Sequence, residues 1–166
     1  PYSPYAASKA AADRMCFGYH KSFGVDVTIL RPSNVYGPRQ KAGAGGAVIS
    51  IFTSLAASGK PLKVFGTGDQ RREYIHVTDL VNAYDLVLKR DDLSGATINV
   101  GSGETPSIKE IASFVTEKMG VQMVNEPPRP GEVPGFSLDS SQIRGLGFEP
   151  KVEFWSGLEN YLGACR

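Results

Sequence analysis

The sequence contains few metal-ligating residues, no long apolar run and little net charge. Its two cysteines, Cys16 and Cys165, are too few for a disulfide scaffold, and together with the two histidines they are scattered and do not form a zinc-ligand pattern. No run of about 18 apolar residues is present, as a membrane-spanning helix would need. A formal net charge of +1 over 166 residues gives no strong attraction to nucleic acid or to a membrane surface. We therefore expect no metal, nucleic acid or membrane among the partners.

The apolar residues that are present fit a globular core of mixed helices and strands. They make up 41% of the 166 residues and fall into periodic segments separated by glycine and proline. Helices are expected over residues 4–22, 48–57, 78–90, 107–120 and 155–163. Strands are expected over residues 25–30, 62–66, 72–75, 97–100 and 136–138, with a proline-rich loop over 125–135.

Several finer expectations follow from residue types. Thr78 is suited to cap its helix, with Val81, Tyr84 and Leu88 on one helical face. Ser107 and Glu110 have capping-box spacing, and Ser140 or Ser141 is expected to cap a short helix. We expect Cys16 to be a buried thiol inside the first helix and Cys165 to be exposed near the end of the chain.

Tyr5 and Lys9 are the first candidates for chemistry. Ser3 suits a helix N-cap and Pro4 the first helical position, so the two residues lie four apart on one helix and project from one face. A phenol titrates near pH ~10, and a neighbouring ammonium lowers that pKa by favouring the phenolate. The pair can therefore exchange a proton with a substrate hydroxyl, and Lys9 can also donate to a ribose hydroxyl. The competing interpretation is a packed tyrosine beside a solvated lysine.

The segment after this helix predicts a ligand-binding edge. Residues 25–30 are apolar and β-branched, which is typical of a buried parallel strand, and Pro32 ends it. Asn34 and the Gly37-Pro38 pair then form a loop at the carboxyl end of the strand, where open α/β sheets bind their ligands. This order of elements predicts that Tyr5 and Asn34 lie near one crevice.

Together these segments resemble a known family. Residues 5–9 (YAASK) followed by residues 30–38 (LRPSNVYGP) are similar to the extended short-chain dehydrogenase/reductases, which include nucleotide-sugar 4-epimerases, 4,6-dehydratases and UDP-glucuronate decarboxylases. The likeness continues, in the family's order, through residues 64–80 (VFGTGDQRREYIHVTDL), 99–103 (NVGSG), 129–132 (RPGE) and 138–141 (LDSS).

The resemblance implies an α/β fold in two parts. Residues 1–40 would be the end of a Rossmann-type domain with a parallel sheet, and residues 41–166 would mainly form a small α/β substrate-binding domain. Residues 78–100 would return to the Rossmann-type sheet. No Gly-x-x-Gly-x-x-Gly turn occurs in the sequence, so we expect the N-terminal dinucleotide-binding half to be absent from it.

The resemblance also assigns residues to the cofactor. Tyr5 and Lys9 would be catalytic and would contact NAD, and main-chain groups of Pro32 and Ser33 would line its nicotinamide. His76 follows a strand and precedes a helix, so we expect it to be structural.

A second set of residues would bind the substrate, a nucleotide-diphosphate sugar. Arg72 and Arg129 would hold the diphosphate, because a guanidinium fork matches its oxygens. Asn34 would donate to the diphosphate or the sugar, Glu132 would accept from the ribose, and Phe65 would lie against the nucleobase. The competing interpretation is that these are ordinary surface or core residues, as we expect for Arg71.

The implied activity is that of an NAD-dependent nucleotide-sugar 4-epimerase, acting by hydride transfer at the sugar C4 with the Tyr/Lys pair as acid and base. A 4,6-dehydratase or a UDP-glucuronate decarboxylase remains open, because both share the first oxidation. A non-catalytic fragment, serving only to bind sugar nucleotides or to assemble, is the alternative from another class. The resemblance implies a cytoplasmic homo-oligomer, or self-association through the surface left by the missing half.

Overall fold

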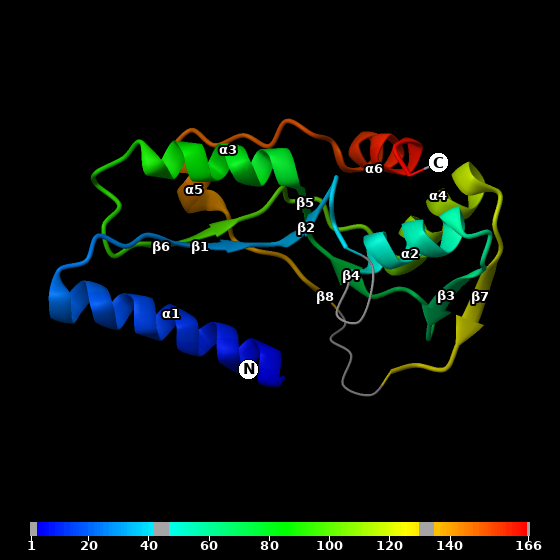
Figure 1. The fold of residues 1–166 in the computed structure, drawn as a ribbon, viewed down its shortest axis with the longest axis horizontal. Helices are drawn as coiled ribbons and strands as arrows, with labels where there is room; N and C mark the ends of the chain where they lie inside the picture. The colour runs from blue at the N-terminus through cyan, green and yellow to red at the C-terminus, as the bar shows by residue number, and fades with distance from the viewer. Residues whose placement is uncertain (1–2, 42–46, 130–134, 166) are drawn as a thin grey trace.

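A computed structural model describes residues 3–41, 47–129 and 135–165 of the chain. These residues form an elongated α/β structure in which helices and short strands follow one another (Figure 1). In chain order the elements are α1 (Pro4–Phe23), β1 (Ile29–Pro32), β2 (Asn34–Tyr36), α2 (Val48–Ala57), β3 (Leu62–Phe65), β4 (Arg71–Arg72), β5 (Tyr74–His76), α3 (Val77–Leu88), β6 (Thr97–Val100), α4 (Ile108–Met119), β7 (Met123–Glu126), β8 (Gly135–Phe136), α5 (Ser141–Gly145) and α6 (Phe154–Gly163).

The described strands pair in parallel, two at a time. The pairs are β1 with β6, β2 with β5, β3 with β7 and β4 with β8. Parallel pairing needs a crossover between the two strands, and helices supply it in this chain. The parallel α/β class predicted from the sequence is therefore observed.

The first helix agrees with its sequence signals. The Ser3 hydroxyl accepts from the Ala6 amide, Pro4 begins the helix, and Gly24 ends it in the left-handed conformation at φ 67°. No residue of α1 is buried within the described structure, and in the view of Figure 1 the helix runs below the β1–β6 pair. Cys16 is consequently exposed, so its expected burial was wrong, whereas Cys165 is partly buried against the core.

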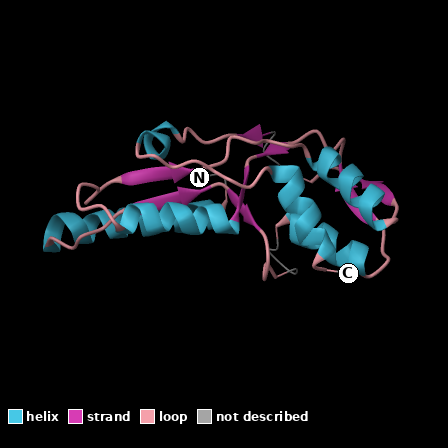
Figure 2. Ribbon diagram, turned by 90° about the horizontal axis from the view of Figure 1, so that it is seen from above, coloured by secondary structure: helices cyan, strands magenta, loops and turns pink. Residues whose placement is uncertain are grey.

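Two clusters of buried apolar side chains form the core. The larger one joins α2, α4 and α6 to β3, with Phe52, Ile111 and Leu158 among its fully covered members. Figure 2 shows these helices gathered near the C terminus beside a strand pair. The smaller cluster lies around β6 and includes Ile98 and Ile143.

The strand expected over residues 25–30 begins late and is less buried than predicted. It starts at Ile29 because its partner β6 begins only at Thr97, and Val25 is 44% exposed. The expected loop at Asn34 is instead the short strand β2, which pairs with β5. Within the described structure β1 has a strand partner, β6, on one side only.

The capping predictions had mixed outcomes. The capping box of Ser107 and Glu110 is present with both hydrogen bonds. The cap of α3 is His76 and not Thr78, because the His76 Nδ1 atom accepts from the Thr78 amide at 3.3 Å. The helical face of α3 that carries Val81, Tyr84 and Leu88 is exposed.

The buried face of α3 is made by other residues, namely Asp79, Ala83 and Val87.

Among the described residues, no helix combines the length and the apolar character needed to cross a membrane, and no cluster of His, Cys, Asp and Glu could hold a metal ion.

Candidate functional site

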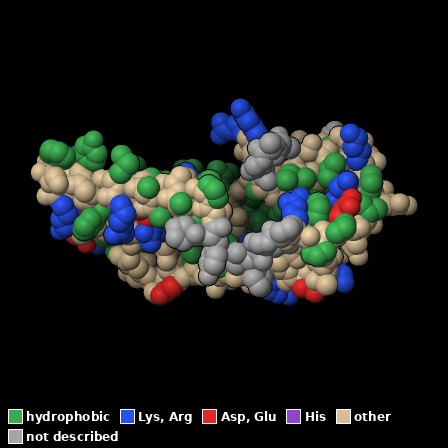
Figure 3. Space-filling view, turned by 90° about the horizontal axis from the view of Figure 1, so that it is seen from below, with side chains coloured by type: hydrophobic (Ala, Val, Ile, Leu, Met, Phe, Trp, Pro, Cys, Tyr) green, Lys and Arg blue, Asp and Glu red, His purple; other side chains and the backbone are tan. Residues whose placement is uncertain are grey.

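A cavity of about 300 Å³ lies between α2 and the strands that follow it. One wall is apolar, because Val48, Ile51 and Leu55 fall on one face of α2 at helical spacing. The opposite side carries polar and aromatic groups from four separate segments, namely Asn34, Lys63, Phe65, Arg72 and Arg129. Figure 3 shows a hollow on one face of the molecule, with hydrophobic side chains inside it and Lys or Arg side chains at its edge.

Arg129 and Phe65 form the closest stacking contact at this cavity. The guanidinium carbon of Arg129 lies 3.7 Å from the centroid of the Phe65 ring. Phe65 ends β3, and Arg129 follows β7, which is the parallel partner of β3. The strand pairing therefore brings together two residues that are far apart in sequence and gives the cavity a flat, positively charged surface.

Arg72 reaches the cavity from β4, while its neighbour points elsewhere. An Arg72 Nη1 atom donates to the Arg71 carbonyl oxygen at 2.8 Å, and the guanidinium carbon lies 5.9 Å from the centroid of Phe136. Arg71 instead pairs with Glu110 at 3.2 Å and does not line the cavity. The alternation of side chains along a strand separates the two arginines.

Asn34 is held at the floor of the site by the backbone. Its Nδ2 atom donates to the carbonyl oxygen of Glu73 at 2.8 Å. Beside it, Tyr74 is almost fully buried. This burial raises the pKa of Tyr74 above its ordinary value, although the positive charge of Arg72 acts in the opposite direction. Tyr74 is therefore a neutral wall of the cavity and cannot serve as a base near neutral pH.

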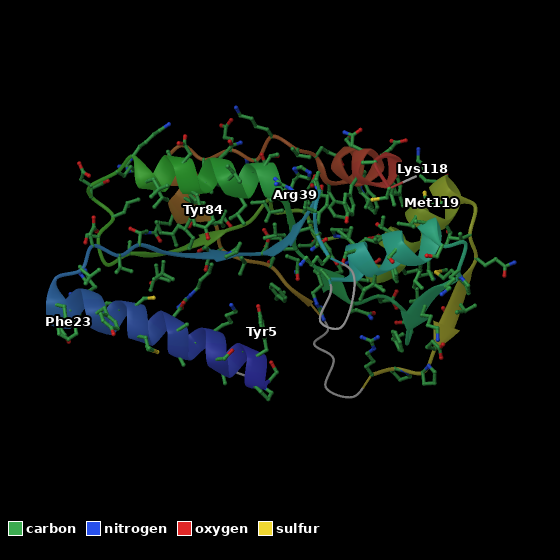
Figure 4. The ribbon with its side chains drawn as sticks, viewed as in Figure 1. Tyr5, Phe23, Arg39, Tyr84, Lys118 and Met119 are labelled. Atoms are coloured by element: carbon green, nitrogen blue, oxygen red, sulfur yellow. The ribbon has the colours of Figure 1, made fainter. Side chains whose placement is uncertain are left out.

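Tyr5 and Lys9 lie on α1, outside this cavity. Tyr5 is 71% exposed at the start of the helix (Figure 4), and the Lys9 Nζ atom lies 5.5 Å from the centroid of its ring. The predicted closeness of these two side chains is thus present. Lys9 also lines a groove beside the ion pair of Asp13 and Arg31, whose Nε donates to the carboxylate at 2.6 Å.

Pro32 and Ser33 were predicted to face the cofactor. Pro32 is exposed, whereas Ser33 is buried and its amide donates to the Val100 carbonyl oxygen at 2.9 Å. That main-chain donor is therefore already in use. The Ser33 hydroxyl, by contrast, is buried without a hydrogen-bond partner among the described residues.

The structure thus brings four of the five predicted substrate-binding residues to one cavity, namely Asn34, Phe65, Arg72 and Arg129. The fifth, Glu132, lies outside the described residues. Sequence reasoning missed the apolar wall of α2 and also Lys63. The available signal for Lys63 was the period of a strand, because residues two apart on β3 share a face with Phe65.

Comparisons with known proteins give the same family as the sequence motifs. A model described as the NAD dependent epimerase/dehydratase family matches residues 1–101. A dTDP-glucose 4,6-dehydratase from Streptomyces niveus is 37% identical over 162 residues, which are 95% of this chain and 47% of that protein.

Two solved structures have closely similar folds. A Thermus thermophilus UDP-glucose 4-epimerase in complex with NAD gives a TM-score of 0.90 at 34% identity, over 100% of this chain and 55% of that one. A Thermotoga maritima UDP-glucose 4-epimerase with UDP-glucose gives 0.89 at 31% identity, over 97% of this chain and 52% of that one.

The chain spans about half the length of the curated relatives it matches. These relatives include both epimerases and dehydratases, so similarity alone does not separate the two activities. The match over most of the chain is sufficient for the family itself: this protein belongs to the NAD-dependent epimerase/dehydratase family.

Proposed function

We propose that this chain supplies the substrate-binding cavity and the catalytic helix of an NAD-dependent nucleotide-sugar 4-epimerase. The observation that carries the proposal is the meeting of Asn34, Phe65, Arg72 and Arg129 at one cavity. An apolar wall, an aromatic ring and two guanidinium groups are what a nucleoside diphosphate needs for its base and its phosphates. The similarity to enzymes that act on UDP-glucose and dTDP-glucose supports this substrate class.

The two arginines would share the diphosphate. In the structure the Arg129 guanidinium covers the face of Phe65 on which a base would stack. A cation–π contact at an exposed site contributes about 0.5–1 kcal/mol, whereas a hydrogen bond to a charged group contributes about 1.5–3 kcal/mol. We therefore expect Arg129 to leave the ring for the diphosphate, which would free the ring face for the base.

The catalytic step would fall to Tyr5 and Lys9. Tyr5 would exchange the proton of the sugar 4-hydroxyl, and the ammonium of Lys9 would favour the phenolate that this exchange requires. NAD, when bound, supplies a hydride acceptor at its nicotinamide ring. The residues present fit that end of the cofactor, because Lys9 can donate to a ribose hydroxyl and the Ser33 hydroxyl, beside the exposed Pro32, has no hydrogen-bond partner in the described part of the chain.

A 4,6-dehydratase is the second candidate. The 37% identity to the Streptomyces niveus dTDP-glucose 4,6-dehydratase favours it, and a UDP-glucuronate decarboxylase would use the same first oxidation. The alternative from another class is a module that binds sugar nucleotides without turning them over. No glycine-rich phosphate-binding turn occurs in this sequence, which is the feature that supports the module.

Calorimetric titration and product analysis separate these candidates. We expect the chain to bind UDP-glucose, dTDP-glucose or both. Free glucose and uridine should not bind measurably, because these two compounds lack the diphosphate. For an assay of turnover the chain would be combined with a dinucleotide-binding half of the family. A product inverted at C4 identifies the epimerase, a 4-keto-6-deoxy sugar the dehydratase, and released carbon dioxide the decarboxylase. Binding without any product identifies the module, and no binding of either nucleotide sugar refutes the proposed site.

A further inference from the structure

A groove between α1 and β1 carries three positive charges and one negative charge. Its charged lining residues are Lys9, Asp13, Arg14 and Arg31. Lys9 and Asp13 lie four residues apart on α1 and therefore on one face of the helix. Side chains at this spacing can form an ion pair, as Asp85 and Lys89 of α3 do at 2.6 Å. The spacing alone would thus allow Lys9 to bind Asp13.

The carboxylate of Asp13 is instead bound by Arg31. The Arg31 Nε atom donates to Asp13 Oδ2 at 2.6 Å, and the Nη2 atom contacts the same oxygen. Since the Asp13 side chain is only 18% exposed, water screens its charge incompletely and the cations of the groove compete for it. The planar guanidinium of Arg31 offers several donors in a fixed geometry, which favours it over an ammonium in this competition.

The other two cations of the groove lie over aromatic rings of α1. The Lys9 Nζ atom lies 5.5 Å from the centroid of the Tyr5 ring, and the Arg14 guanidinium carbon lies 5.7 Å from that of Phe17. Lys9 is therefore directed to the residue one turn before it and not to Asp13, one turn after it. The charge of Arg31 accounts for this direction, because it neutralises the carboxylate and repels the ammonium.

We propose that Arg31 is a positioning residue, which holds Asp13 and thereby keeps the ammonium of Lys9 at Tyr5. The catalytic meaning of this placement rests on the proposed function, in which Lys9 favours the phenolate of Tyr5. Arg31 is itself fixed by β1, where its register partner is Asn99 of β6. The β1–β6 pair thus determines, through one ion pair, where an ammonium on α1 lies.

Nuclear Overhauser effects (NOEs) between the ε-methylene protons of Lys9 and the Tyr5 ring measure this placement in the chain itself. In Arg31→Met the freed Asp13 carboxylate should draw the ammonium away from the ring. A helical ion pair and an exposed cation–π contact are similar in strength, so we expect these NOEs to weaken by about twofold or more. The double variant Arg31→Met/Asp13→Asn has no free carboxylate and should recover the native intensity.

This recovery separates positioning from a purely structural role. Lys9 and Tyr5 lie on the same helix, so a weaker attachment of α1 to β1 does not by itself part them, and both variants lose that attachment equally. The Arg31 side chain is 47% exposed, so its replacement should leave the chain folded, which the backbone chemical shifts of α1 check.

Arg90→Met is the matched control. Arg90 also binds an aspartate, Asp92, through two guanidinium nitrogens at 2.9 and 2.8 Å, but it does not line the groove. Its replacement should leave the NOEs at native intensity, and an equal loss in both single variants would overturn the inference. Unchanged NOEs in Arg31→Met, or no recovery in the double variant, would also overturn it. If the NOEs behave as expected while Tyr5→Phe turns over at the native rate in the proposed enzyme, the placement by Arg31 stands and the proposed function fails.

Discussion

The carbonyl oxygen of Glu73 accepts two hydrogen bonds from Asn34, one from its amide nitrogen at 3.0 Å and one from its side-chain Nδ2 at 2.8 Å. The Glu73 side chain is itself fully buried, and its two carboxylate oxygens accept from the Gly103 amide at 2.8 Å and the Leu138 amide at 2.6 Å. A side chain at Gly101 would collide with this carboxylate. Glu73 therefore ties the floor of the cavity to two loops.

Glu73→Gln should destabilise the protein while changing few atoms. The amide group of glutamine has one acceptor and two donors, so one of the two backbone N–H groups would lose its partner. An unsatisfied buried donor costs about 1–3 kcal/mol, and we expect the free energy of unfolding in urea to fall by about that amount. Glu117→Gln, the same change at an exposed position of α4, is the control and should alter this free energy by less than about 0.5 kcal/mol. Equal stability of both variants would contradict the role of the buried carboxylate.

His76 predicts a pH dependence of stability. Partial burial lowers the pKa of His76 from its ordinary value of 6.5, and the nearby Asp79 carboxylate opposes this with a smaller effect. Below pH 6.5 the unfolded state then binds more protons than the folded state, so stability should fall as the pH is lowered from 7 through this range. Protonation would also remove the Nδ1 acceptor that caps α3.

The check is thermal unfolding between pH 5 and pH 7. His76→Asn keeps a side-chain acceptor suited to an N-cap but removes the titrating group, so the melting temperature should vary less with pH than in the native protein. His20→Asn, the same change at the other histidine, should keep the native slope. A native slope retained in His76→Asn would show that other groups cause it.

The elements of this fold could be predicted where the signals are local. Ser3 and Gly24 bound α1, and Ser107 with Glu110 begins α4, because caps depend on residues within one turn. Burial could not be predicted in the same way. Cys16 is exposed although it lies inside a long helix, since its coverage depends on which other element packs there.

The residues of the candidate site could also be predicted only in part. The family motifs selected Asn34, Phe65, Arg72 and Arg129 residue by residue, and the structure places all four at one cavity. The contact of Arg129 with Phe65 was not predictable, because it depends on the pairing of β3 with β7 across a long crossover. Lys63 was missed because a charged residue in a short strand is usually solvated.

Tyr5 should be required for turnover but not for folding. The Tyr5 side chain is exposed on α1, so Tyr5→Phe should leave the melting temperature unchanged. In the proposed enzyme, loss of the acid–base group should lower the rate by roughly 10²–10⁴-fold. Lys9→Met should shift the pH–rate profile to higher pH and weaken NAD binding. Tyr19→Phe, the same change at another exposed tyrosine of α1, is the control and should leave the rate unchanged. A rate that barely moved in Tyr5→Phe would exclude Tyr5 as the base.

Arg72 and Arg129 should act on one shared diphosphate. Both line the cavity, and replacing either by Ala should weaken UDP or dTDP binding to the chain by about 1.5–3 kcal/mol, the contribution of a hydrogen bond to a charged group. Arg71→Ala removes the same charge next to Arg72 but outside the cavity, so it should change the affinity far less. Because the two arginines would share one partner, the double variant should not be the sum of the singles. Unchanged affinity in both single variants, with no coupling between them, would show that they are ordinary surface charges.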